Sequence, residues 1–272
     1  MEKIILVTGA TAGIGKATAL ALLGSGSTVV IGARDAARGE AARAELAARG
    51  GPDHVDVLTG DFASLASVRG MAESFRRKYP RLDVLINNAG VYRNKRELSA
   101  DGLELMFAIN HLAPFLLTNL LLDSLKSSEG ARVLNITAPT TTKLNFDDLQ
   151  GETKFDSLQA FGASKMGNLL FTFDLARRLE GTEVTVNALH PGLARTGLMD
   201  GSSFLLRLML NAFSASPEKA GAGIVKAALG EQYANQTGNF FANGKEMKAS
   251  DYAHDREVQK RLWDVSEKLV KA

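Results

Sequence analysis

Short apolar segments alternate along this chain with longer segments of helical pattern, and this order constrains the fold more than any other feature. The expected strands cover residues 3–8, 27–31, 55–59, 83–87, 132–136 and 184–189, with 239–241 as a short further candidate. The expected helices cover residues 13–23, 35–48, 65–78, 101–125, 158–179 and 256–270. Such alternation predicts an α/β fold, in which a mostly parallel sheet carries helices on both faces.

Length and composition limit the number of domains, the partners and the compartment that we expect for this protein. The 272 residues suit one domain, from 1 to 272, without repeats or low-complexity segments. The net charge is +2 and the charges are scattered, so we expect no nucleic-acid partner. The absence of cysteine excludes disulfides and suits a reducing cytoplasm, where we expect the protein. We also expect no metal, no signal peptide and no membrane span, because the most apolar run, 112–125, is short and contains Asn119 and Asp123.

A glycine-rich turn, Thr8-Gly9-Ala10-Thr11-Ala12-Gly13-Ile14-Gly15, lies between the first strand and the first helix. Glycines let the backbone turn tightly and approach a pyrophosphate, which then rests on the helix N-terminus. Glycine spacing alone is a weak signal, and a turn without a ligand is the alternative. The strand, loop and helix in this order favour a dinucleotide and predict a Rossmann-type, doubly wound sheet.

The glycine spacing resembles the Thr-Gly-x-x-x-Gly-x-Gly pattern of the short-chain dehydrogenase/reductase family, and other landmarks of that family follow along nearly the whole chain. The resemblance implies that residues at these landmarks bind the cofactor. Gly9, Thr11, Gly13, Ile14 and Gly15 would hold the pyrophosphate, and Asp61, next to the cofactor-binding Phe62, would contact the adenine. The motif with Asn88, Ala89 and Gly90 follows the fourth strand, Lys165 would hold the ribose, and Pro191, Gly192 and Thr196 would hold the nicotinamide amide. Within the family, the segments 32–35, 148–152 and 261–266 resemble the retinol-dehydrogenase-like branch.

The end of the second strand indicates which nicotinamide cofactor is bound. Members of the family that use NAD place a carboxylate there, and this slot aligns with Ala33, followed by Arg34. A guanidinium can form a bidentate pair with a 2′-phosphate, and Arg38 lies one helical turn further. We therefore expect NADPH or NADP rather than NADH. The alternative is that Arg34 is a solvated surface charge and that Asp35 only caps the next helix.

The catalytic set of the family is incomplete in this chain. The run 161–165 resembles the Tyr-x-x-x-Lys signature, with Phe161 at the position of Tyr and Lys165 in place. Ala138 aligns with the serine that holds the substrate carbonyl, whereas Asn110 matches the asparagine of the active site. Two positions have thus lost a hydroxyl while two keep their polar groups, and the source of the proton for the reduced carbonyl is the open question.

Three answers stay open at the level of the sequence. A phenol beside the ketone can supply the proton itself, and the chain resembles the atypical ketoreductases of aromatic polyketide antibiotic pathways, such as the simocyclinone pathway. A replacement group can act instead, from Tyr92, Thr137, the threonines at 140–142 or His190. Thirdly, the chain can be an inactive NADP(H)-binding regulator. We favour the first, an NADPH-dependent ketoreductase for a bulky, hydrophobic phenolic substrate.

The segment of about 197–216 reads as a small lid over the substrate, because residues 201–215 are mostly apolar and follow the Pro191-Gly192 loop. A membrane-surface helix or a dimer contact would have the same composition. The oligomeric state, monomer or homodimer, stays open. The expected substrate pocket consists of Tyr92, Ala138, Thr140, Phe161, Leu205, Met209 and Phe213.

Overall fold

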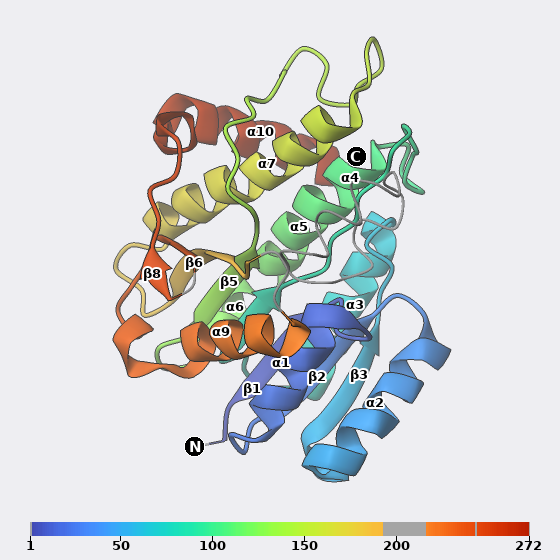
Figure 1. The fold of residues 1–272 in the computed structure, drawn as a ribbon, viewed down its shortest axis with the longest axis vertical. Coiled ribbons are helices and arrows are strands. Elements are labelled where there is room, and N and C mark those ends of the chain that lie inside the picture. The colour runs from blue at the N-terminus through green and yellow to red at the C-terminus, as the bar shows by residue number, and fades with distance from the viewer. Residues whose placement is uncertain (1, 193–215, 243, 272) are drawn as a thin grey trace.

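The structure, a computed structural model, describes residues 2–192, 216–242 and 244–271 (Figure 1). Its strands form one sheet in the order β3-β2-β1-β4-β5-β6-β7-β8. All neighbouring strands are parallel except the last pair, β7 and β8. The bounds are β1 Ile4–Thr8, β2 Thr28–Ala33, β3 Val55–Thr59, β4 Val84–Asn87, β5 Arg132–Ile136, β6 Thr185–His190, β7 Phe240–Ala242 and β8 Lys245–Glu246.

Helices cover both faces of this sheet, as the alternation predicts. Strand residues alternate between two apolar cores, one packed against α3, α5, α7 and α10 and the other against α1, α2 and α9. The bounds are α1 Gly13–Leu23, α2 Ala36–Gly50, α3 Leu65–Lys78, α4 Leu105–Phe107, α5 Ala113–Leu120, α6 Leu122–Lys126, α7 Ser157–Arg178, α9 Pro217–Leu229 and α10 Arg256–Lys271. Short 3₁₀ turns cover Pro52–His54, Glu231–Tyr233 and Asp251–His254.

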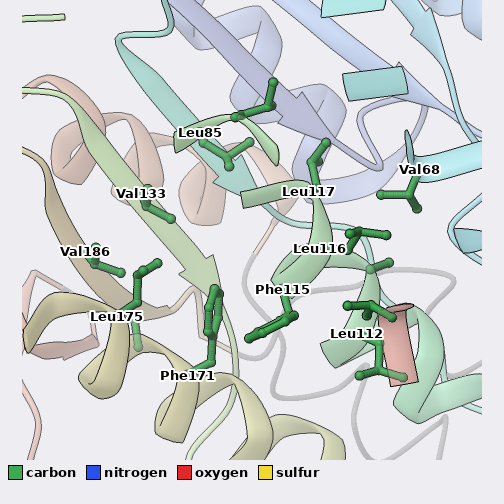
Figure 2. Packing of buried hydrophobic residues seen from close by; sticks show 14 of the residues in the cluster. Val68, Leu85, Leu112, Phe115, Leu116, Leu117, Val133, Phe171, Leu175 and Val186 are labelled. Carbon is green, nitrogen blue, oxygen red and sulfur yellow. The ribbon is translucent and has the colours of Figure 1, made fainter. Parts of the chain in front are cut away.

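The larger core joins α5 and α7 to the middle of the sheet. Figure 2 shows Phe115 of α5 and Phe171 of α7 between the two helices, with Val133 of β5 to one side of them. Trp263 of α10 packs on both rings, with centroids 4.9 Å from Phe115 and 6.0 Å from Phe171. Helix α10 therefore covers the face that α5 and α7 form (Figure 1).

The expected helix over 101–125 is wrong in its start and in its continuity. It begins at Leu105 because Glu104 accepts hydrogen bonds from the backbone N–H groups of Met106 and Phe107, which caps the helix there. A π-helical turn, Ala108–Leu112, then separates α4 from α5, and a further break at Leu121 separates α5 from α6. Single π turns of this kind are frequent at functional sites, and this one carries Asn110.

Two elements were not expected from the sequence. Helix α9 begins after Ser216, whose side chain accepts from the N–H of Lys219, and Pro217 stands in its first turn. Strand β8 is only two residues long and pairs antiparallel with β7 at the edge of the sheet. Of the expected lid over 197–216, only Ser216 lies within the described residues. No helix in the described ranges is long and apolar enough to cross a membrane.

Candidate active site

The glycine-rich loop lies where the strand order of the sheet reverses. β1 pairs with β2 on one side and with β4 on the other, so the loops after β1 and β4 leave the sheet as neighbours. In open α/β sheets, ligands bind in the crevice outside the carboxyl ends of the strands at such a point. Gly9 and Gly13 adopt left-handed φ angles of 65° and 54°, a region that glycine enters without steric cost.

Gly15, in the first turn of α1, is required by packing rather than by its backbone angle. A Cβ at this position would lie 2.4 Å from the carbonyl oxygen of Gly9 and 2.5 Å from Nδ2 of Asn88. The same Nδ2 donates to the carbonyl of Thr8 at 2.8 Å. Oγ1 of Thr8 accepts from the N–H groups of Asn88 and Ala89, each at 3.0 Å. The loops after β1 and β4 thus form one packed unit.

The N-terminus of α1 differs from those of the other long helices around the sheet. Asp35, Ser64, Asp156 and Ser216 accept hydrogen bonds at the starts of α2, α3, α7 and α9. Ala12 stands at the start of α1 and has no side-chain acceptor. Backbone N–H groups therefore remain available at the positive end of the helix dipole. This cradle, with its glycines, fits the pyrophosphate of a dinucleotide.

Two arginines follow β2 at the expected position of the adenosine ribose. Arg34 and Arg38 are exposed, and neither makes an ion pair with a carboxylate among the described residues. Asp35 accepts from the backbone N–H of Arg38 at 2.9 Å, so its carboxylate caps α2 as expected. The carboxylate of Asp35 is therefore engaged at the start of α2. The guanidinium groups of Arg34 and Arg38 stay unpaired with any carboxylate of the described residues at the end of β2.

The residues expected beside the adenine have local partners in the structure. Oδ1 of Asp61 accepts from the N–H of Ala63 at 2.9 Å, and the N–H of Asp61 donates to Ser67 Oγ, also at 2.9 Å. Phe62 is 8% exposed and packs in the larger core. Asp61 thus shapes the loop after β3.

Lys165 places a buried ammonium group beside this crevice. It lies one turn after Phe161 on α7, and its Nζ is 5.5 Å from the centroid of the Phe161 ring. A Cβ on Gly90 would lie 3.4 Å from the same Nζ, which places the lysine against the loop after β4. Burial lowers the pKa of Lys165 from 10.5 to about 8. Within the described ranges, the ammonium has no hydrogen-bond acceptor and no carboxylate partner, so it fits a ligand that brings acceptor oxygens, such as a ribose.

Asn110 supports the same loop from the π-helical turn. Its Oδ1 accepts from the N–H of Val91 at 2.7 Å, and its Nδ2 donates to the carbonyl of Val91 at 2.9 Å. The same Nδ2 also donates to Oγ of Ser164 at 3.0 Å, and this hydroxyl donates to the carbonyl of Phe161 at 2.8 Å. Asn110 is 1% exposed, and its hydrogen bonds join the loop after β4 to α7. Ser164 was missed by the sequence reasoning, although it directly precedes Lys165.

Three of the hydroxyls considered as replacement acids, on Tyr92, Thr137 and Thr140, already have partners. The hydroxyl of Tyr92 is hydrogen-bonded to that of Ser157 at 2.9 Å, and its ring packs edge-on against Phe161 at 5.6 Å. Oγ1 of Thr137 donates to the carbonyl of Lys165 at 2.9 Å. Oγ1 of Thr140 is directed to the carbonyl of Gly162 at 3.3 Å. These groups hold α7 in place.

Of the remaining residues expected in the site, some lie within the described part of the chain and others lie outside it. Ala138 is half-buried directly after β5, and His190 ends β6, where burial lowers the pKa of its imidazole. Pro191 and Gly192 follow, and Gly192 has a φ of 84° that favours glycine. Four expected residues lie outside the described residues, and these are Thr196, Leu205, Met209 and Phe213.

Comparison with known proteins shows which family the chain belongs to. The model of the short chain dehydrogenase family matches residues 3–203. The chain belongs to this family. This short-chain dehydrogenase is 41% identical over 286 residues to retinol dehydrogenase 14 of Mus musculus, covering 98% of this chain and 86% of the relative. It is 41% identical over 279 residues to retinol dehydrogenase 13 of Homo sapiens, covering 98% and 84%. The expected family and its retinol-dehydrogenase-like branch are therefore confirmed.

Solved structures of the family share the fold. A protein from Mycobacterium paratuberculosis superposes with a TM-score of 0.75 and 32% identity, covering 99% of this chain and 94% of that one. The RhlG/NADP complex of Pseudomonas aeruginosa gives a TM-score of 0.71 and 27% identity, covering 89% and 95%. A short chain dehydrogenase from Burkholderia cenocepacia in complex with NADP gives 0.70 and 25%, covering 89% and 96%. The short-chain dehydrogenase fold and a nicotinamide cofactor are thereby supported.

Proposed function

We propose that this short-chain dehydrogenase uses NADPH to reduce a ketone on a bulky aromatic substrate, and that a phenol of the substrate supplies the proton. One observation carries the proposal. Phe161 stands where the family places its acid, and the hydroxyls around it, on Tyr92, Thr137 and Thr140, already have partners. A positioned general acid is worth roughly 10²- to 10⁴-fold in rate, so a reductase without one needs another proton donor.

When bound, the cofactor supplies the hydride, and the chain has to hold both reactants and exclude water. Lys165 would hold the ribose hydroxyls, while Asn110 and Ser164 fix the backbone on either side of it. Phe161 and Tyr92 form an aromatic wall, and Ala138 adds a methyl group where a serine would add a donor. An apolar wall of this kind suits a flat aromatic ketone better than a small polar one.

The decisive experiment uses a pair of ketones in which a methyl group replaces the phenolic proton of one to give the other. An ortho-acetyl naphthol and its methyl ether have nearly the same shape, but only the naphthol can protonate the new alkoxide. We expect NADPH oxidation with the naphthol and a kcat/KM at least about 10²-fold lower with the ether. Phe161→Tyr should raise turnover of the ether, because it places a phenol beside Lys165. Equal turnover of both ketones by the unaltered enzyme would contradict substrate assistance.

Two other functions predict different results in the same assay. The similarity to retinol dehydrogenases makes a retinoid carbonyl the second candidate, so retinal belongs in the panel. Turnover of retinal at a rate above that of the naphthol would favour it. A catalytically inactive NADP(H)-binding regulator would bind NADPH and oxidise it with none of the ketones.

The preference for NADPH depends on Arg34. We expect Arg34→Ala to weaken NADPH binding about 10- to 100-fold and to leave NADH binding unchanged, because a charged hydrogen bond to a phosphate is lost. Arg49→Ala is the matched control, since Arg49 is an exposed arginine at the other end of α2. Calorimetric titration with both cofactors checks this. Equal affinities for NADH and NADPH in the unaltered protein would contradict the assignment.

A further inference from the structure

The ammonium of Lys165 is a buried positive charge without a negative partner in the part of the chain that the structure describes. The residue is 7% exposed, and no carboxylate of the described ranges pairs with it. Its nearest described interaction partner is the ring of Phe161, at 5.5 Å. A cation–π contact stabilises such a charge by less than the cost of removing it from water without a counter-ion.

A ribose does not remove this imbalance. Its hydroxyls are neutral, so they can accept the hydrogen bonds of the ammonium but cannot neutralise its charge. In a protein interior of low dielectric, an uncompensated cation attracts whatever anion forms next to it. The ring of Phe161 cannot become that anion, because it carries no ionisable group.

We propose that Lys165 is the counter-ion of the phenolate that the substrate becomes when it protonates its own alkoxide. The inference rests on the proposed function. In the step, the carbonyl carbon gains a C–H bond with a hydride from the reduced nicotinamide, which is oxidised. The resulting alkoxide takes the proton of the adjacent phenol, so one O–H bond breaks and another forms. The phenolate left behind regains a proton from water after release.

The position of Lys165 suits this role. Its Nζ lies 5.5 Å from the centroid of the Phe161 ring on α7, and a Cβ on Gly90 of the loop after β4 would lie 3.4 Å from it. Tyr92 packs on the same Phe161 ring, so an aromatic ketone that contacts these two rings would lie near the ammonium. Burial lowers the pKa of Lys165 to about 8, so most of the ammonium remains charged at pH 7. An opposite charge within about 4 to 6 Å lowers the pKa of an acidic group by 1 to 3 units. The site would therefore select ketones whose adjacent hydroxyl is acidic.

The test reads the ionisation of a bound phenol without any turnover. The ortho-acetyl naphthol is titrated from pH 5 to 9 in complex with the enzyme and saturating NADP, and its absorbance reports phenol or phenolate. We expect the pKa of the bound naphthol to be at least about one unit below its value in buffer. Lys165→Met should abolish most of this difference, and Lys165→Arg should retain it. The positive nicotinamide is the same in all three complexes, so it cannot explain a difference between them.

Lys95→Met is the matched control, because it removes the same charge from an exposed position on the loop after β4. It should leave the pKa of the bound naphthol unchanged. An unaltered enzyme that shows no phenolate signal, or a Lys165→Met variant that shows the same signal, overturns the proposal. The two proposals fail separately. Ionisation of the naphthol without any reduction of ketones would refute the proposed function alone, whereas reduction without ionisation would refute the counter-ion alone.

Discussion

Replacing Lys165 by methionine should make the cofactor-free protein more stable while it weakens cofactor binding. Burial lowers the pKa of Lys165 from 10.5 to about 8, which at about 1.4 kcal/mol per pKa unit corresponds to about 3 kcal/mol. This is the order of the free energy by which the buried charge destabilises the fold at neutral pH. Methionine has a similar length, keeps an apolar contact with Phe161 and carries no charge. Since the cation–π contact is lost, we expect a net gain of about 1 to 3 kcal/mol.

The pH dependence of this gain has a defined sign. Below about pH 8 the lysine is charged in both the folded and the unfolded chain, so the penalty is complete. Between about pH 8 and 10.5 the folded chain releases its proton while the unfolded chain keeps it, so the penalty shrinks as the pH rises. The advantage of Lys165→Met should therefore be full at pH 7 and fade toward pH 10.5.

Thermal unfolding followed by circular dichroism is a suitable assay. A domain of this size gains about 2 to 4 °C in Tm for each kcal/mol. Saturating NADPH should raise the Tm of the unaltered protein more than that of Lys165→Met, because ligand stabilisation follows the binding constant. Lys95→Met should leave the Tm unchanged, since surface substitutions alter stability little. If cofactor-free Lys165→Met melts at or below the temperature of the unaltered protein at pH 7, the reasoning about the buried charge is wrong.

Two more outcomes follow from packing and burial elsewhere. Gly15→Ala should destabilise the protein by about 1 to 3 kcal/mol in a urea titration and weaken NADPH binding, because its Cβ would lie 2.4 Å from a backbone oxygen. Gly70→Ala, at an exposed position of α3, meets nothing within 4 Å and should be neutral or slightly stabilising in the same titration. Burial lowers the pKa of His111 from 6.5 to about 3, so stability should fall below about pH 6.5 by up to about 1.4 kcal/mol per pH unit. His111→Gln should flatten that part of the urea-unfolding profile, and an equal slope in both proteins would contradict the assignment.

The sequence predicted the parts of the fold that depend on local pattern. Strands β3 and β5 and helices α1 and α3 have the bounds that were expected from the order of apolar and turn-forming residues in the sequence. The stretch 101–125 was predicted as one helix, since its apolar residues continue without a gap. Its breaks come from the cap at Glu104 and the π-helical turn around Asn110, which depend on partners far away in the chain, such as Gln150 and Val91.

In the candidate site, too, some features could be predicted from the sequence and others depended on contacts between distant segments. The glycine loop could be recognised from its spacing between a strand and a helix, whereas Arg34, Asn110 and Lys165 were predicted from the resemblance to the family. Whether Tyr92, Thr137 or Thr140 could replace the missing acid could not be decided from spacing. A hydroxyl is available only if no neighbour holds it, and that depends on α7 lying against the loops after β4 and β5.

By itself, the sequence determined the alternation that makes an α/β sheet, the position of the cofactor loop, and the loss of hydroxyls at Phe161 and Ala138, since these are properties of residue type and order. Only the tertiary structure decided that Lys165 is buried without a counter-ion among the described residues and that the hydroxyls of Tyr92, Thr137 and Thr140 are already hydrogen-bonded. Desolvation and hydrogen-bond satisfaction arise where α7 meets the loops after β4 and β5, and no local stretch of sequence contains both sides of that contact.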